Sequence, residues 1–416
     1  MHKNIFDKII YLAVLIVSPF FLVFILFYRK KKIVRIWGLT SHRIGHFAGN
    51  TEMHICSKID NNQKKFLDIC YFKGEVSNEF LAKKWKEKLI IYPRQIVYPL
   101  HKLINVLSYY FIIFKEHVVF DISLHSRDYN NYIDKYKPVL NLNKNEINKG
   151  KSLLKKFGLE ENDKFICFIV RDSAYLNKTF SNINWSYWNY RDYDIDNFIP
   201  AAEELTKLGY YVFRMGKISK KKIISKNEKI IDYSFSKYKS DFLDIFLGAN
   251  CEFCLTTDIG YDQVPYIFRR PLASITDPIS LMKLSSKKFL NIFSSYYSIN
   301  ENKKLSIEEI FKKKAAYFYD EKYLKDKGIS LIKPDSEDIK DLALDMEKYV
   351  KNNFKLSLED EILNDVFFNI YNKNVNSDNF INDIQSNYSL KVNKLHNLYY
   401  GKISPKFLSK KKFLIQ

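Results

Sequence analysis

Twenty consecutive residues without a charge, Ile9–Tyr28, constrain the fold of this 416-residue chain more than any other feature. At about 1.5 Å per residue, a helix of this length covers roughly 30 Å, the thickness of a bilayer's hydrocarbon core. Pro19 lies in the middle of the run, so a bent helix that enters and leaves one leaflet is an alternative. A buried core helix fits less well, because a cationic cluster follows. The sequence predicts a membrane anchor over residues 1–32.

The basic residues on either side of this run predict its orientation. Lys3 and Lys8 precede it, whereas Arg29, Arg35 and three lysines between them follow it. By the positive-inside rule, the body of the chain then lies in the cytoplasm. A secretory signal is disfavoured, because no small-residue cleavage site follows the run. Because the strands predicted below all begin after Lys32, we expect the body to fold without residues 1–32.

The composition restricts the partners of the body. Lysine and arginine number 67 against 47 acidic residues, a formal net charge of +20. Such an excess favours anionic partners: phosphate-bearing substrates, an anionic membrane surface or nucleic acid. No RNA- or DNA-binding module is recognisable, so nucleic acid is not expected. Aromatic residues make up 16%, which excludes a disordered chain, and five scattered cysteines form no disulfide framework.

Beyond Lys32, short apolar runs alternate with helical patterns. The predicted strands are Ile33–Leu39, Phe66–Phe72, Leu89–Tyr92, Val118–Ile122, Lys164–Val170, Tyr210–Met215, Glu252–Thr256 and Pro271–Ile275. Apolar runs of this kind, separated by helices, indicate parallel strands with helices on both faces. The predicted fold class is α/β, with two Rossmann-type, doubly wound domains facing each other across a cleft. They occupy residues 33–150 and 151–350, and a helical tail over 351–416 follows.

A segment with glycines and histidines, His42–Glu52, follows the first predicted strand. A glycine-bearing loop between strand and helix lets backbone amides approach an anionic ligand. His46 is the candidate general base, since an imidazole pKa near 6.5 suits proton abstraction, and Glu52 is the second candidate. A packed histidine and a first-turn glutamate are the structural alternatives. The candidate acceptor contacts in this loop are Arg43, Gly45, Gly49 and Asn50.

Further candidates follow strands of the second domain, where ligands of parallel α/β sheets collect. The predicted donor-binding residues are Arg171, Asp172, Arg214, Thr257, Asp258, Gly260 and Asp262. Arg171 offers a planar fork to phosphate oxygens, and the segment that contains Gly260 suits a phosphate cradle. The structural alternatives are an Arg171–Asp172 ion pair and an N-cap role for Asp262.

Three patterns typical of metal sites are weak in this chain. His42 and His46 are four residues apart but lack the glutamate of a zinc-binding helix motif. The acidic run Asp192–Asp196 precedes an amphipathic helix, where acidic residues serve as caps. Cys251 and Cys254 stand without two further ligands. We expect no metal and no other cofactor.

Five stretches of the sequence resemble glycosyltransferases of bacterial surface-polysaccharide gene clusters. They are Arg43–Glu52, Cys167–Leu176, Asn197–Gly216, Ser240–Pro271 and Ile403–Leu408. The family is GT-B-like, with two Rossmann-type domains and the donor nucleotide held mainly by the C-terminal one. The resemblance implies sugar transfer from a nucleotide-sugar, usually without an obligatory metal.

These expectations combine into one predicted function. The chain is expected to be a membrane-anchored glycosyltransferase that uses a nucleotide-sugar donor and a lipid-linked saccharide acceptor in surface polysaccharide biosynthesis. It would act at the inner membrane of a bacterial cell, through a single-pass or re-entrant anchor. The leaving diphosphate would be neutralised by Arg171, Arg214 and helix N-termini. The alternative is a non-catalytic GT-B-like scaffold protein of a polysaccharide assembly complex.

Overall fold

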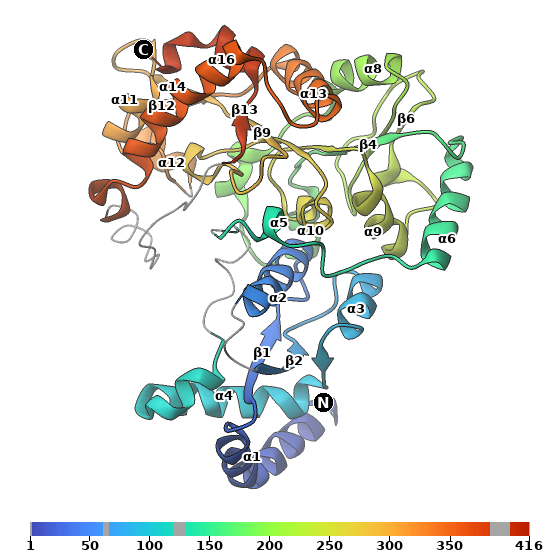
Figure 1. Ribbon diagram of the computed structural model, residues 1–416, viewed down its shortest axis with the longest axis vertical. Helices are drawn as coiled ribbons and strands as arrows, with labels where there is room; N and C mark the ends of the chain where they lie inside the picture. Colours follow the sequence, from blue (N-terminus) through green and yellow to red (C-terminus); the bar gives the residue numbers. More distant parts are fainter. Residues whose placement is uncertain are drawn as a thin grey trace. The chain divides into compact units, whose positions relative to one another are not determined.

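The computed structural model describes residues 2–60, 66–119, 128, 130–318, 320–382 and 400–415 (Figure 1). The chain forms two compact units. Unit 1 comprises Met1–Ser126 and Pro138–Asn141, and unit 2 comprises Arg127–Lys137 and Leu142–Gln416. The division therefore falls before the boundary near residue 150 that the sequence predicts. The predicted arrangement of two domains across a cleft stays a prediction.

Unit 1 contains a parallel sheet in the order β1-β2-β3. Its strands are β1 (Ile33–Leu39), β2 (Phe66–Phe72) and β3 (Ile90–Ile91), and β1 pairs with β2 along its full length. On the other edge of β1, Val118 forms a parallel bridge with Ile36. The predicted strand Val118–Ile122 is described only through Val119, and its remainder lies outside the described residues.

Helices cover both faces of this sheet (Figure 1). They are α1 (His2–Tyr28), α2 (Thr51–Asp60), α3 (Glu79–Lys86) and α4 (Arg94–Tyr110), with a 3₁₀ turn at Ile112–His117. Val34 and Ile36 of β1 pack against α4. Because side chains alternate between the two faces of a strand, Trp37 points to the other face. There it packs against His54 of α2, with ring centroids 4.4 Å apart. Unit 1 is thus a small layered α/β unit.

The segment after β1 is helical rather than an open loop. A π-helical turn at His46–Asn50 runs directly into α2, and Gly45 has φ −63° and ψ −51°, which is right-handed helical geometry. Phe47 and Ala48 are fully buried, so their packing holds the helical turn despite the two glycines. The expectation of a glycine-bearing loop between strand and helix is therefore wrong for this segment.

Helix α1 belongs partly to the core of unit 1. Val14, Ser18 and Ile25 are buried on one side of α1, and Ile25 joins a cluster with residues of β1 and α4 such as Val34 and Ile104. The expectation that the body folds without residues 1–32 therefore fails for unit 1, whose core includes Ile25. Removal of residues 1–32 would open this cluster instead of leaving it intact.

We expect Ile25→Ala to destabilise unit 1 by about 2–5 kcal/mol, because it leaves a cavity in a closed cluster. The matched control is Ile16→Ala on the same helix, where the side chain is 69% exposed. Its effect should stay within about 0.5 kcal/mol. Urea unfolding of the detergent-solubilised full chain measures both, and equal effects would contradict the packing of α1 described above.

Unit 2 is built on a seven-stranded sheet in the order β13-β9-β8-β7-β4-β5-β6, with every pair parallel. The strands are β4 (Phe165–Ile169), β5 (Tyr211–Arg214), β6 (Ile230–Ile231), β7 (Cys254–Thr256), β8 (Leu272–Ile275), β9 (Phe289–Ile292) and β13 (Lys402–Ile403). β4, the first in sequence, lies between β5 and β7, so the winding reverses beside it. This confirms the prediction of a doubly wound parallel sheet in this part of the chain.

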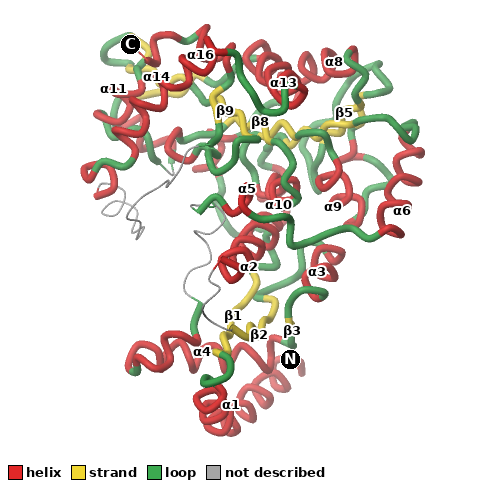
Figure 2. The backbone as a smooth tube through the Cα atoms, viewed as in Figure 1, coloured by secondary structure: helices red, strands yellow, loops and turns green. Residues whose placement is uncertain are grey.

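Figure 2 shows helices on both sides of the row of strands. The helices α8 (Ile199–Lys207) and α13 (Ser336–Lys351) lie on one side, and α9 (Asp241–Asn250) and α10 (Gln263–Ile267) lie on the other. The helix α6 (Lys144–Leu154) packs on α9, since a Cβ atom on Gly150 would lie 2.0 Å from the Phe246 ring. This close packing explains why α6, most of which precedes the predicted boundary at residue 150, belongs to unit 2.

The segment predicted as a separate helical tail completes the sheet of unit 2. After α14 (Leu358–Val375), β13 adds to the edge of β9 and leads into α16 (Pro405–Lys410). The Ile403 amide donates to Asn364 Oδ1 at 2.8 Å, and Asn364 Nδ2 donates to the Ile403 carbonyl at 3.2 Å. Ile403 and Leu408 are fully buried, which gives the tail its place in the core.

The remaining elements of unit 2 are short. A small antiparallel sheet has the order β11-β10-β12. The elements are α5 (Tyr132–Lys135), α7 (Ala174–Thr179), β10 (Ser295–Ser298), β11 (Lys303–Lys304), α11 (Ile307–Lys312), α12 (Glu321–Asp326) and β12 (Ile329–Ile332).

Candidate functional site

Two predicted donor-binding residues meet where the winding of the unit 2 sheet reverses. The Arg171 amide, just beyond β4, donates to Thr257 Oγ1, just beyond β7, at 2.8 Å. The Thr257 amide donates to the Ile169 carbonyl at 3.1 Å. Ligands of open α/β sheets bind at this reversal point, at the carboxyl ends of the strands. The structure therefore places these two residues where a ligand site is expected.

The Arg171 side chain is buried but not fully paired. Its Nε lies 2.8 Å from Asp192 Oδ1, and its guanidinium carbon lies 5.7 Å from the centre of the Trp188 ring. Burial raises the pKa of Asp192. Within the described part of the chain, neither Arg171 Nη2 nor Trp188 Nε1 has a hydrogen-bond partner, although both atoms are buried. Unpaired buried donors are costly, so two of them on neighbouring side chains indicate a place for an acceptor-rich ligand.

Asp172 does not pair with Arg171, contrary to the structural alternative considered for that arginine. Its carboxylate accepts from the Ala174 amide at 2.9 Å and from the Lys220 amide at 2.9 Å. Arg214, at the end of β5, is buried and donates to Asp232 Oδ1 at 2.9 Å and to the Lys221 carbonyl at 3.2 Å. Asp172 and Arg214 therefore hold the loops beside the candidate site.

The segment after β7 forms a charged cluster. Asp258 has a positive φ of 54°, and its Oδ2 lies 3.2 Å from Arg191 Nη2. Lys283 contacts Asp258 and lies 3.1 Å from Asp262 Oδ2. Burial opposes the charged form of Lys283, but the two carboxylates outweigh it and raise its pKa. Gly260 begins the 3₁₀ turn that leads into α10.

Asp262 does not cap a helix with its side chain. Its buried carboxylate accepts from Thr256 Oγ1 at 3.1 Å and from Gln263 Nε2 at 3.1 Å, in addition to its contact with Lys283. Burial raises the pKa of Asp262. The N-cap alternative for Asp262 is therefore wrong, and the residue fixes the turn after β7 from inside.

The sequence does not predict three residues at this site: Trp188, Arg191 and Lys283. Trp188 lies under both arginines, with its ring centre 5.1 Å from the Arg191 guanidinium carbon. Neither Trp188 nor Arg191 follows a strand, since both belong to the 3₁₀ segment Ser186–Arg191. For Trp188 and Arg191, the feature that could have indicated a binding site is the aromatic-rich segment 185–191, which ends in Arg191 directly before the acidic run.

The acidic residues and cysteines that suggested metal sites in the sequence have other surroundings in the structure. Asp192 pairs with Arg171, and Asp194 Oδ1 lies 3.2 Å from Lys221 Nζ. All five cysteines are free and buried. Across the described ranges, no group of three or more His, Cys, Asp or Glu side chains is placed to hold a metal ion.

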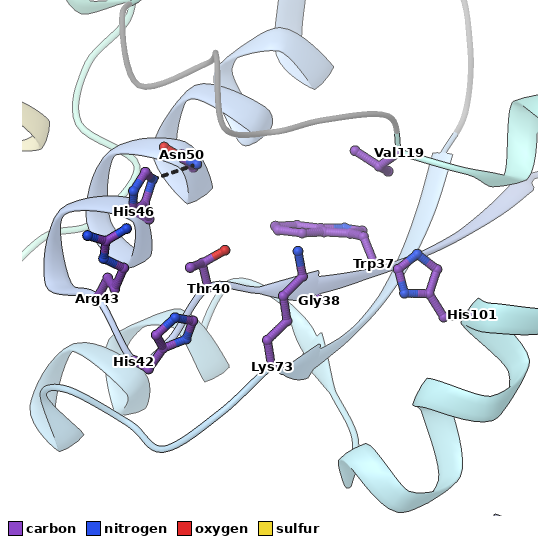
Figure 3. A pocket seen from close by; sticks show the side chains of 10 residues that line it. All are labelled: Trp37, Gly38, Thr40, His42, Arg43, His46, Asn50, Lys73, His101 and Val119. Atoms are coloured by element: carbon purple, nitrogen blue, oxygen red, sulfur yellow. Dashed lines mark hydrogen bonds between the residues drawn. The ribbon is translucent and has the colours of Figure 1, made fainter. Parts of the chain in front are cut away.

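A second candidate site is a pocket of about 260 Å³ in unit 1 (Figure 3). It is lined by Trp37, Gly38, Thr40, His42, Arg43, His46, Asn50, Lys73, His101 and Val119. Thr40 and Lys73 follow the carboxyl ends of β1 and β2, and His101 belongs to α4. Of the predicted loop residues, Arg43, His46 and Asn50 thus share one pocket, whereas Gly45 and Gly49 lie in the adjoining helical turn.

The two candidate bases have different surroundings. His46 lines the pocket, with Nδ1 3.3 Å from Asn50 Nδ2, and burial followed by the Arg43 charge lowers its pKa below 6.5. Glu52 is fully buried, and its Oε1 accepts from the Val139 amide at 3.0 Å. Glu52 is absent from the pocket lining and instead holds the Pro138–Asn141 segment against α2.

No protein-family model and no curated protein sequence matches this chain. Among solved structures, the chain is similar to a glycosyl transferase family 9 protein from Veillonella parvula DSM 2008, with a TM-score of 0.38 and 10% identity over 62% of this chain and 85% of that one. It is also similar to the E. coli ADP-heptose lps heptosyltransferase II, with a TM-score of 0.34 and 14% identity over 62% of this chain and 90% of that one. At these identities and TM-scores, the similarity carries no argument about function. A function for this chain must follow from its own residues.

Proposed function

We propose that this chain is a glycosyltransferase that transfers a sugar from a nucleotide-sugar donor to a lipid-linked glycan acceptor in the synthesis of a bacterial surface polysaccharide. The observation that carries the proposal is the buried Arg171 guanidinium at the reversal point of the unit 2 sheet, with Nη2 unpartnered among the described residues. A diphosphate supplies the oxygens that such a donor needs. The resemblance of five sequence stretches to surface-polysaccharide glycosyltransferases supports the same function.

In this proposal the two units have different tasks. Arg171, together with the Trp188 indole, binds the donor diphosphate and neutralises the charge that develops as the nucleotide leaves. The ion-paired cluster of Asp258, Asp262 and Lys283 holds the turn beside the donor. His46 of unit 1 removes the proton from the acceptor hydroxyl. No metal or other cofactor is part of the proposal.

A thermal-shift screen of nucleoside diphosphates and nucleotide-sugars tests this function. At a ligand concentration of about 100 times the dissociation constant, a bound nucleotide should add roughly 2.7 kcal/mol of stability and raise the melting temperature. A shift with one base and not with the others would identify the donor class. Melting temperatures that stay unchanged with every nucleotide would contradict the transferase and favour the scaffold.

Membrane attachment is the second part of the proposal. By length and composition, the segment Asp7–Tyr28 could cross a membrane, a property that signal sequences and core helices share. The side of α1 that does not face α4 exposes a row of large apolar side chains: Ile9, Leu12, Ile16, Val17, Phe20, Val23, Phe24 and Phe27. The basic run Arg29–Lys32, directly after α1, suits an anionic membrane surface. These features support an anchor at the inner membrane with the body in the cytoplasm.

The double variant Ile16→Asp/Phe20→Asp should move the protein from the membrane fraction to the soluble fraction. Each carboxylate costs about 2.5–3.5 kcal/mol at the centre of a bilayer. The matched control is Ile224→Asp in unit 2, where the side chain is 84% exposed and the distribution should not change. Fractionation of cells that express each variant measures this, and a double variant that stays in the membrane fraction would contradict attachment through this face.

A further inference from the structure

The pocket of unit 1 lies at a reversal point of its own sheet. β2 flanks one edge of β1, and the Val118 bridge flanks the other. The pocket is lined by residues that follow β1 and β2 and by Val119, next to that bridge. This is the position at which open α/β sheets bind ligands.

The lining of this pocket is cationic. Arg43 and Lys73 carry full charges, three further lining residues are histidines, and none of the ten lining residues is acidic. Burial, followed by the charge of Arg43, lowers the pKa of both His42 and His46. Burial, followed by the charge of Lys73, lowers the pKa of His101 to about 4. Among the described residues that line the pocket, the formal charges are all positive, and such a lining favours an anion.

The absence of a side chain at Gly38 leaves room for Lys73 to reach the pocket. A Cβ atom on Gly38 would lie 2.6 Å from Lys73 Cγ and 2.7 Å from Tyr71 Cζ. Because Gly38 has no side chain, the Lys73 stem crosses the end of β1. Figure 3 shows the Lys73 amine and the Thr40 hydroxyl directed toward the space beside the Trp37 ring. The cationic group is thus brought into the cavity by a specific backbone position.

The same pocket contains a buried donor without a partner. Trp37 is only 2% exposed, and its Nε1 has no hydrogen-bond partner among the residues that the structure describes. An indole N–H can only donate, so it requires an acceptor atom. Arg43, Lys73 and Trp37 together offer charge and donors to a compact anion with several oxygens.

We propose that this pocket binds a phosphate group, and that the group belongs to the acceptor, in which a phosphate joins the saccharide to its lipid. The assignment to the acceptor rests on the proposed glycosyltransferase function. The phosphate chemistry itself does not, because it follows from the lining of the pocket. Lys73 and Arg43 neutralise the phosphate, and Trp37 Nε1 donates to one of its oxygens.

The two candidate sites can be observed separately through tryptophan. The chain has four tryptophans, of which Trp37 lines the unit 1 pocket and Trp188 contacts Arg171 in unit 2. The full chain labelled with 5-fluorotryptophan is titrated with inorganic pyrophosphate and, separately, with nucleoside diphosphates. The ¹⁹F signals are assigned with Trp37→Phe and Trp188→Phe. Pyrophosphate should shift the Trp37 signal saturably, and a bound nucleotide should shift the Trp188 signal.

The variant Lys73→Gln should weaken the pyrophosphate effect on Trp37 about tenfold, the loss expected for one charge-assisted contact. The control Lys83→Gln removes an exposed lysine of α3 in the same unit and should leave the affinity unchanged. The pocket proposal is overturned if ~10 mM pyrophosphate leaves the Trp37 signal in place, since millimolar binding is already weak. It is also overturned if both lysine variants weaken binding equally, or if only nucleotides shift Trp37. A Trp37 shift without any nucleotide binding would support the pocket while contradicting the glycosyltransferase.

Discussion

The variant Arg171→Lys should bind nucleotide about 10- to 150-fold more weakly than the parent. Lysine keeps the positive charge but replaces a planar fork with a single ammonium group, so a two-point contact to a diphosphate is lost. A hydrogen bond to a charged group contributes about 1.5–3 kcal/mol, which corresponds to this loss. The ion pair with Asp192 can be retained by lysine, which limits damage to the fold.

Calorimetric titration of the nucleotide found in the screen measures this effect. The matched control is Arg270→Lys, because Arg270 lies at the amino end of β8, opposite to the strand ends beside Arg171, and donates to the Ala249 carbonyl at 2.7 Å. The control variant should bind like the parent. If Arg171→Lys melts at the parent's temperature and also binds like the parent, Arg171 does not hold the donor.

The variant His46→Ala should transfer sugar about 10²–10⁴-fold more slowly while binding nucleotide normally, because it removes general-base assistance from unit 1. Burial, followed by the Arg43 charge, lowers the pKa of His46. His42 and Lys73 lower this pKa further, whereas the hydrogen bond with Asn50 raises it. The imidazole is then neutral at pH 7, as a base must be. Turnover should therefore fall in acidic solution, with the midpoint of this fall below pH 6.5.

A transfer assay beside the nucleotide titration separates the two candidate bases. Glu52→Gln should lower the melting temperature, since Glu52 is buried and bonded to the Val139 amide, and should leave the acid limb of the pH profile in place. If His46→Ala transfers like the parent, His46 is a structural residue. If His46→Ala instead loses nucleotide affinity while Arg171→Lys keeps it, the tasks of the two units are reversed.

The sequence predicts the central strands well because their signal is local. β4 is completely buried and reads as an unbroken apolar run, and β1, β2, β5, β7 and β8 fall within their predicted ranges for the same reason. β13 has two residues and pairs with a strand more than one hundred positions earlier, so nothing near it in the sequence marks it. The burial of Ile25 likewise depends on α4, which is remote in sequence.

Of the candidate site, too, the sequence predicts the residues with a local signal and misses those placed by distant contacts. The rule that ligands bind at strand ends predicts the meeting of Arg171 and Thr257, because both follow apolar runs. The contacts of Asp258 with Arg191 and Lys283 span 67 and 25 positions, and no periodicity reports them. In unit 1, the glycines after β1 suggest a loop, but the burial of Phe47 and Ala48 decides in favour of a helical turn.

The central claim is that a nucleotide binds at the carboxyl ends of β4 and β7. Hydrogen exchange of the full chain, with and without a saturating nucleoside diphosphate, tests this claim directly. Bound nucleotide should slow exchange at residues 170–173 and 257–262, which surround Arg171 and Thr257, and leave residues 44–60 of unit 1 unchanged. Protection confined to other segments, or none at saturation, would contradict the claim.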